Sequence, residues 1–491
     1  YWENNSSLGL YEKKLYYMNQ IEEYFKDDDS SKGFTTILNS MFNNLESLAG
    51  APGDLDRRKT FISSCQDFAT YFNSVSIGLN QIQTDANLEV KSTVDNINAI
   101  AQKIALLNNQ INVIEMQGGH ANELRDERAL LIDELSNIVP TETQETEVMN
   151  TNDEYYTGCT EFRVKINGQL LVDTREYRTL ECKTRDTKVN QSDVDGLYDI
   201  VWSDTGNTFN ATSKYMSGTL KALLDTRDGN NEENFKGTVD YFYGTKLVIT
   251  NTTQNSMEKM TMAEEGVITI DNKKFEYSSF TVDYDAMGVP YYQAQMNEFL
   301  RAFCMKFNDI EMQGQDLNGD PMKAFFVARD LVTGEQEDLN KSDTYTQITS
   351  AMSSYYKLTA GSFEVAKASV KDPNIFSTTA DIVNGPDKAE ILELLKPLKE
   401  QEKLYRGSGA NGFLQCMLSD ISVDTNEAKL FYENHKNISH TITNQRLSIS
   451  GVDEDDEALD LVKFQNAYNL ASKMISTMAE MYDQLILNTA V

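Results

Sequence analysis

The sequence is poor in the residue types that mark metal sites, cross-linked scaffolds and membrane spans. It has only seven prolines, two tryptophans and five cysteines in 491 residues. The cysteines are scattered, odd in number and form no Cys-x-x-Cys pair, which argues against a zinc site or a disulfide framework; they are Cys65, Cys159, Cys182, Cys304 and Cys416. No run of 18 apolar residues occurs, so no segment is long enough to cross a bilayer as a helix.

Positive charge is scarce as well. The chain has 44 Lys and Arg against 76 Asp and Glu, a formal charge of −32. Such a surface repels phosphate backbones and anionic lipids, so we expect neither nucleic acid nor a membrane as a partner. The first residues, YWENNSSLGLYEKK, include neither an initiator Met nor the charged start and apolar stretch of a secretory signal peptide. We therefore expect the chain to be a fragment of a longer protein.

The first part of the chain, residues 10–140, has a helical pattern almost throughout. Apolar residues follow each other there in steps of seven, three and four, a heptad pattern: Leu79, Ala86, Val90, Thr93, Ile97, Ile100, Ile104, Leu107, Ile111 and Ile114. At 1.5 Å per residue this helix is roughly 50 Å long, which suits a rod rather than a globule. Gly118 and Gly119 end it, and a second helix follows before Pro140.

The last helix is predicted to run from about Asp455 to Leu487. Its apolar residues repeat in steps of three and four, and we call them the assembly seam: Leu461, Phe464, Tyr468, Ala471, Ile475, Met478, Tyr482 and Leu485. This set is either ordinary core or a surface for a neighbouring helix or subunit. Its continuity almost to the last residue, without a second apolar face, favours the neighbour. We also expect Leu79–Ile114 to pack against a helix near Ala428–Leu447.

The middle of the chain changes to a strand pattern. Phe162, Val164 and Ile166 alternate with charged residues before Asn167-Gly168, which predicts a hairpin with a type I′ turn. Strands are also predicted in YDIVWS (198–203), GTKLVIT (244–250) and GVITIDNKKFEYSSFTVDYD (266–285). The predicted fold class is a multidomain α+β protein, with a long helical-bundle or coiled-coil rod formed by both chain ends and inserted β-rich outer domains. The predicted segments are a helical rod (1–141), a β-rich domain (142–216), a helical return (217–235), a β insertion (236–289), a rod helix (290–315), a mixed segment (316–424), the returning rod (425–450) and an inner coiled-coil helix (451–491).

No spacing in the sequence matches a catalytic or metal-binding set. The acids Asp453–Glu457 lack the glycine and the spacing of a calcium loop, so we interpret them as the favourable acidic first turn of a helix. Asp316, Asn318 and Asp320 alternate, but Gly319 is misplaced for such a loop, and a tight turn is predicted. His120, His435 and His440 form no HExxH pattern. We therefore predict no catalytic residue, no metal and no cofactor.

Two stretches resemble bacterial flagellar axial proteins. The C-terminal one has SGV, an acidic triplet and L-x-x-x-Q-x-x-Y, here Ser450, Gly451, Val452, Asp455, Asp456, Glu457, Leu461, Gln465 and Tyr468. The helical one is similar to the FlgK family of hook-associated proteins at Asn98, Ile104, Leu107, Asn108, Ile111, Gly118, Ala121, Asn122, Leu124, Asp126, Arg128 and Leu135. The segments GTLKALLDTRDGNN and MQGQDLNGDPMKAFF also resemble this family.

This resemblance implies a non-enzymatic structural subunit that joins the flagellar hook to the filament by helical stacking of coiled-coil termini. It implies self-association in a ring, contacts with the hook protein and the second junction protein FlgL, the export chaperone FlgN, and secretion by the flagellar type III apparatus to the extracellular flagellum. The family's N-terminal helix is missing from this sequence, and residues 236–289 have no clear counterpart in the family. The alternative function is a secreted enzyme, such as a muramidase, carried on an axial scaffold.

Overall fold

The computed structural model describes the chain except for residues 28–32, 153–154, 212–214, 230–236, 243–245, 252–266, 271–272, 277–287, 338, 340–353, 386, 401–403, 405–408, 451–453 and 490–491. The described residues form two compact units. The main unit is Trp2–Glu433, and the C-terminal unit is Asn434–Val491 together with Tyr1.

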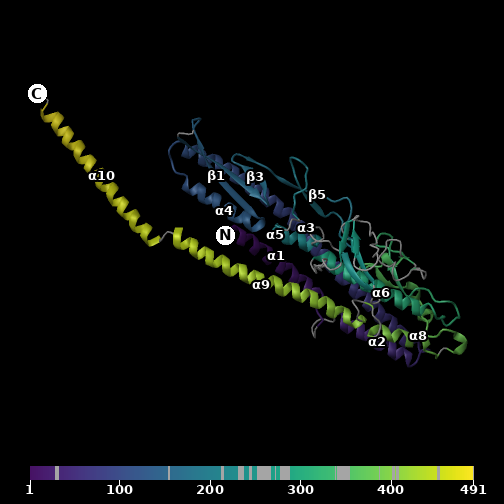
Figure 1. The fold of residues 1–491 in the computed structure, drawn as a ribbon. Coiled ribbons are helices and arrows are strands. Elements are labelled where there is room, and N and C mark those ends of the chain that lie inside the picture. The colour runs from purple at the N-terminus through teal and green to yellow at the C-terminus, as the bar shows by residue number, and fades with distance from the viewer. Residues whose placement is uncertain are drawn as a thin grey trace. The chain divides into compact units, whose positions relative to one another are not determined.

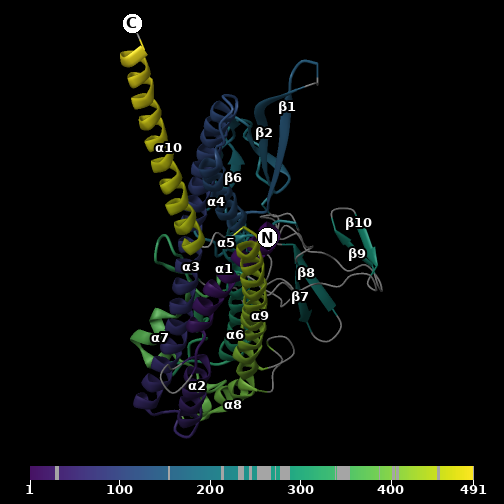
Figure 2. The ribbon, with the colours of Figure 1, turned by 90° about the vertical axis from the view of Figure 1, so that its left-hand side faces the viewer.

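Four helices come first in the main unit: α1 (Trp2–Tyr24), α2 (Phe34–Ala49), α3 (Leu55–Glu115) and α4 (Asn122–Ile138). The 61 residues of α3 form its spine, with α2 at one end and the strands β1 and β2 at the other (Figures 1 and 2). Asp54 caps α3, because its side chain accepts hydrogen bonds from the backbone N–H groups of Asp56 (2.9 Å) and Arg57 (3.3 Å). Helices α1 and α4 are joined by Trp2, whose indole N–H donates to Asp133 at 2.6 Å.

The predicted apolar line on α3 is buried along most of its length. Leu79, Val90 and Ile104 are fully buried, whereas Ile114 at the end is 38% exposed. The line is covered by α4, by α5 (Thr219–Asp228) and by strands of the β region. The described contact between α3 and α9 (Ala410–Ser450) lies elsewhere, where Phe413 approaches Phe72. The pairing of Leu79–Ile114 with Ala428–Leu447 stays a prediction, because the residues from Asn434 onward belong to the other unit.

A four-stranded antiparallel sheet follows α4 in the order β1-β2-β3-β4. Its strands are β1 (Thr141–Met149), β2 (Tyr156–Ile166), β3 (Gln169–Asp173) and β4 (Glu176–Tyr177). The predicted hairpin is confirmed, since β2 and β3 pair across Asn167 and Gly168, whose φ angles are 45° and 74°. Two positive φ angles are what a type I′ turn requires.

The rest of the β region consists of short antiparallel pairs. Strands β5 (Leu180–Thr184) and β6 (Tyr198–Trp202) pair, and the latter is the predicted strand YDIVWS. After α5, β7 (Gly237–Phe242) pairs with β8 (Lys246–Asn251), and β9 (Val267–Ile270) with β10 (Lys273–Glu276). The strands predicted in GTKLVIT and GVITIDNKKFE are therefore present. The expected continuation of β structure through 277–285 lies outside the described residues.

The other end of the main unit is built on α6 (Val289–Glu311). The elements that follow it in the chain are the strands β11 (Phe326–Arg329), β12 (Gln336–Glu337) and β13 (Phe363–Val365), the helices α7 (Lys367–Lys371) and α8 (Glu390–Leu395), and the 3-10 helices η1 (Ser354–Lys357), η2 (Pro373–Ile375), η3 (Ile382–Asn384) and η4 (Lys396–Lys399). Of these, β11, α8, η1 and η4 contact α6. Phenylalanines of α2, α3, α6 and α9 meet here, and the rings of Phe299 and Phe413 stack at 4.2 Å. The predicted turn is present as well: Asp316 Oδ1 accepts from the backbone N–H groups of Asn318 and Asp320, both at 2.8 Å, and φ of Gly319 is +87°.

Two helices account for the C-terminal unit. Helix α9 begins in the main unit at Ala410, earlier than the boundary predicted at 425, and continues into this unit to Ser450. Its first part is anchored through Tyr291, whose hydroxyl donates to Asp420 at 2.9 Å. Helix α10 (Glu454–Thr489) is the predicted last helix. Long helices near both chain ends and small sheets between them confirm the predicted fold class; the individual domain boundaries stay a prediction.

Candidate assembly site

The assembly seam lies on α10 with every side chain exposed. Phe464 is 74% exposed, Tyr468 72% and Ile475 69%, and the other members are also classed as exposed. Large apolar side chains at helical spacing gain about 25 cal/mol per Å² when they leave water. Covering this surface of α10 would therefore be favourable.

A second line of apolar side chains runs along α10, and the sequence analysis missed it. Leu459, Leu470, Met474 and Met481 follow each other at steps of 11, 4 and 7 residues and are between 58% and 67% exposed. At 3.6 residues per turn this second line lies about a third of a turn from the seam. The expectation that α10 has no second apolar face was wrong. The second line was overlooked because its residues are spaced irregularly and fall outside the three- and four-residue steps of the seam.

A polar line separates the two apolar lines on the remaining side of α10. Gln465, Asn469, Ser476 and Asp483 follow each other at steps of 4, 7 and 7 residues and are all exposed. The apolar surface is thus wider than the roughly 100° stripe that one packing partner covers on an amphipathic helix. Its width fits a helix that has more than one neighbour.

A run of acidic residues lies at the start of α10. Helix α10 begins at Glu454, so Asp455, Asp456 and Glu457 are in its first turn, as predicted. Carboxylates at that place interact favourably with the positive end of the helix dipole. Among the described residues, no group of three or more His, Cys, Asp or Glu is placed to hold a metal ion. His435 lies on α9, as does His440, and His120 precedes α4.

Side-chain amides of α3 hold the β region in place, and this role was not foreseen from the sequence. The Asn112 amide donates to the Thr160 carbonyl and accepts from the Thr160 N–H, both at 2.9 Å. Asn98 binds Leu180 in the same two-fold way, at 2.8 and 2.7 Å. Asn87 accepts from the Tyr198 N–H at 2.9 Å. The only sequence signal was that Asn98 and Asn112 stand beside the apolar line.

A cluster of charged residues joins the far end of α3 to α4 and β1. Arg125 forms two hydrogen bonds of 2.7 Å with the Glu115 carboxylate and reaches Glu145 at 2.9 Å. These hydrogen bonds from Arg125 lower the pKa of Glu115. Arg128 is almost fully buried, stacks over Phe162 with its guanidinium carbon 3.7 Å from the ring centroid, and also pairs with Glu145. The cluster ties strand β1 to the helices.

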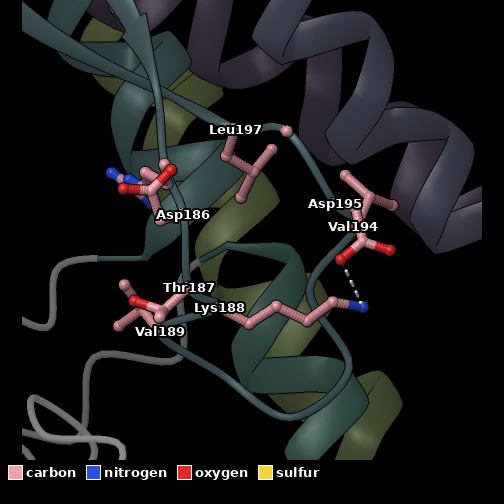
Figure 3. Close-up of a pocket in the computed structure, with 9 residues that line it drawn as sticks. Asp186, Thr187, Lys188, Val189, Val194, Asp195 and Leu197 are labelled. Atoms are coloured by element: carbon pink, nitrogen blue, oxygen red, sulfur yellow. Dashed lines mark ion pairs between the residues drawn. The ribbon is translucent and has the colours of Figure 1, made fainter.

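A small hollow lies between the loops that flank β5 and β6 (Figure 3). Its volume is about 180 Å³, and its walls come from residues 185–189 and 194–197. The side chain of Lys188 reaches across it to pair with Asp195 at 3.3 Å (Figure 3). The lining residues include neither a histidine nor a cysteine.

The flagellar hook-associated protein FlgK helical-domain model matches residues 18–242, where α3, its amide anchors and the four-stranded sheet lie. A second model, the C-terminal part of flagellar basal body rod FlgEFG proteins, matches residues 443–488 and so includes the seam. The Flagellar hook-associated protein 1 of Bacillus subtilis strain 168 is 24% identical over 489 residues, which are 98% of this chain and 81% of that protein. The chain is thus similar to the FlgK family of flagellar hook-associated proteins over almost its whole length.

Other comparisons agree with this family. The Flagellar hook-associated protein 1 of Salmonella typhimurium is 22% identical over 512 residues, with 98% of this chain and 85% of that protein covered. The solved structure of the flagellar hook junction protein FlgK from Burkholderia pseudomallei superposes with a TM-score of 0.59 at 13% identity. That match covers 91% of this chain and all of the solved chain, and it shows a shared fold.

Proposed function

We propose that this protein is a structural subunit of the bacterial flagellum that forms the junction between hook and filament. The observation that carries the proposal is α10, a helix with two exposed apolar lines in a chain that is similar to the FlgK family. A soluble monomer has no use for so wide an uncovered apolar surface, whereas a subunit covers it on assembly. The hook and the filament are both stacks of subunits, and a junction subunit has to contact both.

The proposed mechanism is stacking of identical subunits through their terminal helices. The seam and the second line of α10 pack against neighbouring helices, and the subunits close into a ring. The hook protein contacts this ring on one side and the second junction protein FlgL on the other. The β regions face outward, where their small sheets do not interfere with the packing of the helices.

Export precedes this assembly. We propose that the chain leaves the cell through the flagellar type III apparatus, accompanied by the chaperone FlgN, and functions in the extracellular flagellum. The formal charge of −32 keeps subunits apart until their helices meet. Neither nucleic acid nor a lipid surface is expected as a partner. Among the described residues, no helix is both long and apolar enough to cross a membrane.

The alternative, a secreted enzyme such as a muramidase on an axial scaffold, gains no support. The family matches name hook-associated and rod proteins. The hollow in Figure 3 contains the carboxyl groups of Asp186 and Asp195, and Lys188, which pairs with Asp195, crosses the space in which a substrate would have to lie.

The test replaces the natural protein by variants in its own host. Changing Phe464 and Ile475 of the full-length protein to Asp puts two charges into the seam, at a cost of several kcal/mol if the seam is buried in the assembly. We expect export to continue while filaments fail to attach, so that filament subunits accumulate in the medium. The matched control changes Asn469 and Ser476 to Asp, which adds the same charge to the polar line. Normal filaments with the seam variant would refute α10 as the assembly element.

A further inference from the structure

The end of α6 carries a fully buried carboxyl group without a direct counter-ion. Glu311 is the last residue of α6, and its relative exposure is 0%. Its Oε1 atom accepts a hydrogen bond from the backbone N–H of Ser377 at 2.6 Å. Its Oε2 atom has no hydrogen-bond partner among the described residues, and neither does the buried hydroxyl of Ser377. The hydrogen bond between Ser377 and Glu311 thus joins two residues, each of which has a buried side-chain oxygen without a partner.

The buried cation in this region, Arg58 of α3, is directed to neutral acceptors instead. Its Nε atom donates to the Pro52 carbonyl at 2.8 Å, its Nη1 atom to the Phe376 carbonyl at 2.5 Å, and its Nη2 atom to the Thr378 hydroxyl at 3.1 Å. Nη1 also reaches the Pro373 carbonyl at 3.5 Å. The described ion pairs do not include one between Arg58 and Glu311. Arg58 thus fastens the segment 373–378 by its carbonyl groups, and Glu311 fastens it by an N–H.

Few other ionisable groups face Glu311. From α3 these are Arg58 and the buried thiol of Cys65, both of which feel the Glu311 charge. In the segment that covers it, Asp372 and Asp381 turn away and bind backbone N–H groups of Asn374 (3.0 Å) and Val383 (2.9 Å). Helix α8 also packs on α6, and its Glu393 pairs with Lys396 at 2.6 Å. The charge of Arg58, felt over a distance, is therefore the main attraction available to an ionised Glu311.

We propose that Glu311 is held as the uncharged acid and acts as a proton-dependent latch, which fastens the segment 373–379 to α3 and α6 and loosens when the carboxyl ionises. An ionised carboxylate would sit in this site with one hydrogen bond, one oxygen without a partner and no ion pair. Burying a charge on these terms is strongly unfavourable. The uncharged acid avoids that cost.

The sign of the pH effect follows from the burial. Burial raises the pKa of Glu311 well above its ordinary value of 4.5, and the Ser377 N–H and the Arg58 charge only partly oppose this. The folded state then binds the proton more tightly than the unfolded chain. Folding stability is complete below the ordinary pKa and falls as pH rises toward the folded pKa. Over that window this residue lowers the folded-to-unfolded ratio by up to about tenfold per pH unit.

The test compares the full chain with its Glu311→Gln variant by urea unfolding from pH 4 to pH 8. Glutamine keeps the shape and the acceptor for Ser377 N–H but cannot ionise. We expect the variant to match the unchanged protein at pH 4 and to exceed it increasingly as pH rises. The control Glu298→Gln, on the same helix, should keep the full decline of the unchanged protein. A Glu311→Gln variant that loses stability most at pH 8 would show an ionised, attractive carboxylate and overturn the proposal.

Two spectroscopic measurements keep the proposal testable if the variant folds poorly. At neutral pH the infrared spectrum of the folded protein should contain the carbonyl stretch of a protonated carboxylic acid, and Glu311→Gln should reduce it. In the unchanged protein, hydrogen exchange of the Ser377 amide should accelerate with pH beyond the intrinsic effect of hydroxide. Exchange that follows the intrinsic rate alone, or an infrared band that the variant leaves untouched, would show that the site does not hold this proton.

Discussion

Asn98 of α3 and Leu180 of β5 lie 82 residues apart in sequence and are joined by a pair of hydrogen bonds. The Asn98 side chain donates to the Leu180 carbonyl at 2.8 Å and accepts from the Leu180 N–H at 2.7 Å. The amide thereby takes the place of a neighbouring strand for that residue. Asn112 does the same for Thr160. In this way a long helix, which has no sheet edge to offer, still fixes the position of strands.

Replacing Asn98 by Leu should destabilise the main unit by about 1–3 kcal/mol, because a buried N–H and a buried carbonyl lose their partner. Leu180 is only 3% exposed, so water does not readily replace the amide. Urea unfolding measures the loss. The control is Asn109→Leu, at an exposed position of the same helix. Equal losses in both variants would mean that the amide pair contributes nothing beyond helix stability.

Removing the Phe299 side chain should loosen the first part of α9. Phe299 and Phe413 are both almost fully buried, and their rings stack at 4.2 Å, so Phe299→Ala leaves a cavity and costs about 3–5 kcal/mol. Limited proteolysis should then cut near the start of α9 faster than in the unchanged protein. Val332→Ala, at a side chain that is 94% exposed, is the comparison and should change neither stability nor cleavage.

The Glu115–Arg125 pair should contribute to stability in a pH-dependent way. Because the hydrogen bonds from Arg125 lower the pKa of Glu115 below its usual value of 4.5, the contribution is present above that value. It is lost as pH falls through the lower pKa of the folded state. We expect Arg125→Gln to weaken the protein at pH 7 and to lose less than the unchanged protein on acidification. Parallel stability curves for the two proteins between pH 3 and pH 6 would contradict this.

Gly218 should tolerate no side chain, because a Cβ atom there would clash with neighbouring backbone. Comparison with Gly206 separates this clash from the strain of a positive φ angle. Both Gly218 and Gly206 have positive φ angles, +93° and +71°, so alanine strains the backbone at either place. A Cβ atom at Gly218 would also lie 2.2 Å from the Ile138 carbonyl oxygen, whereas nothing lies within 4 Å at Gly206. Thermal unfolding should show a clearly larger loss for Gly218→Ala. Similar losses would mean that only the φ angle matters.

The second apolar line should matter to assembly as much as the seam does. Changing Leu470 and Met474 to Asp should prevent filament attachment, because both side chains are exposed in the C-terminal unit and have to be covered elsewhere. Counting attached filaments and released filament subunits in the host measures this. If filaments still attach in this variant and fail to attach only when Phe464 and Ile475 are changed, then α10 has a single surface for a partner.

The features that could be predicted from the sequence are those that depend on local residue patterns. The apolar line of α3, the last helix α10 with its acidic first turn and the turn at Asn167 depend on local spacing or on a dipeptide, and they were predicted correctly. Strand β1 was not predicted, because TETQETEVM has no apolar alternation and becomes a strand by pairing with β2. The earlier start of α9 was hidden by the glycines near Ala410, which the phenylalanine core overrides.

In the candidate assembly site, too, regularly spaced residues could be predicted from the sequence and the others could not. The seam residues could be named because their steps are regular, whereas the second line is spread over longer steps. The buried state of Glu311 could not be inferred at all, because nothing in the sequence near it tells that Ser377 and Arg58 approach from distant segments. Contacts between segments far apart in the chain carry no local signature. Their partners become visible only when the chain is folded.

The amide pairs of α3 have an evolutionary consequence. An asparagine that binds a backbone N–H and a backbone carbonyl must itself stay an asparagine, but the residue that it binds can change its side chain without breaking the contact. Mutations in the strands can then accumulate without compensating changes in the helix, as long as the main chain keeps its path. Such contacts leave no covarying pair of columns for comparative genomics to detect. The outer strands of a protein built in this way are free to diversify while the spine stays recognisable.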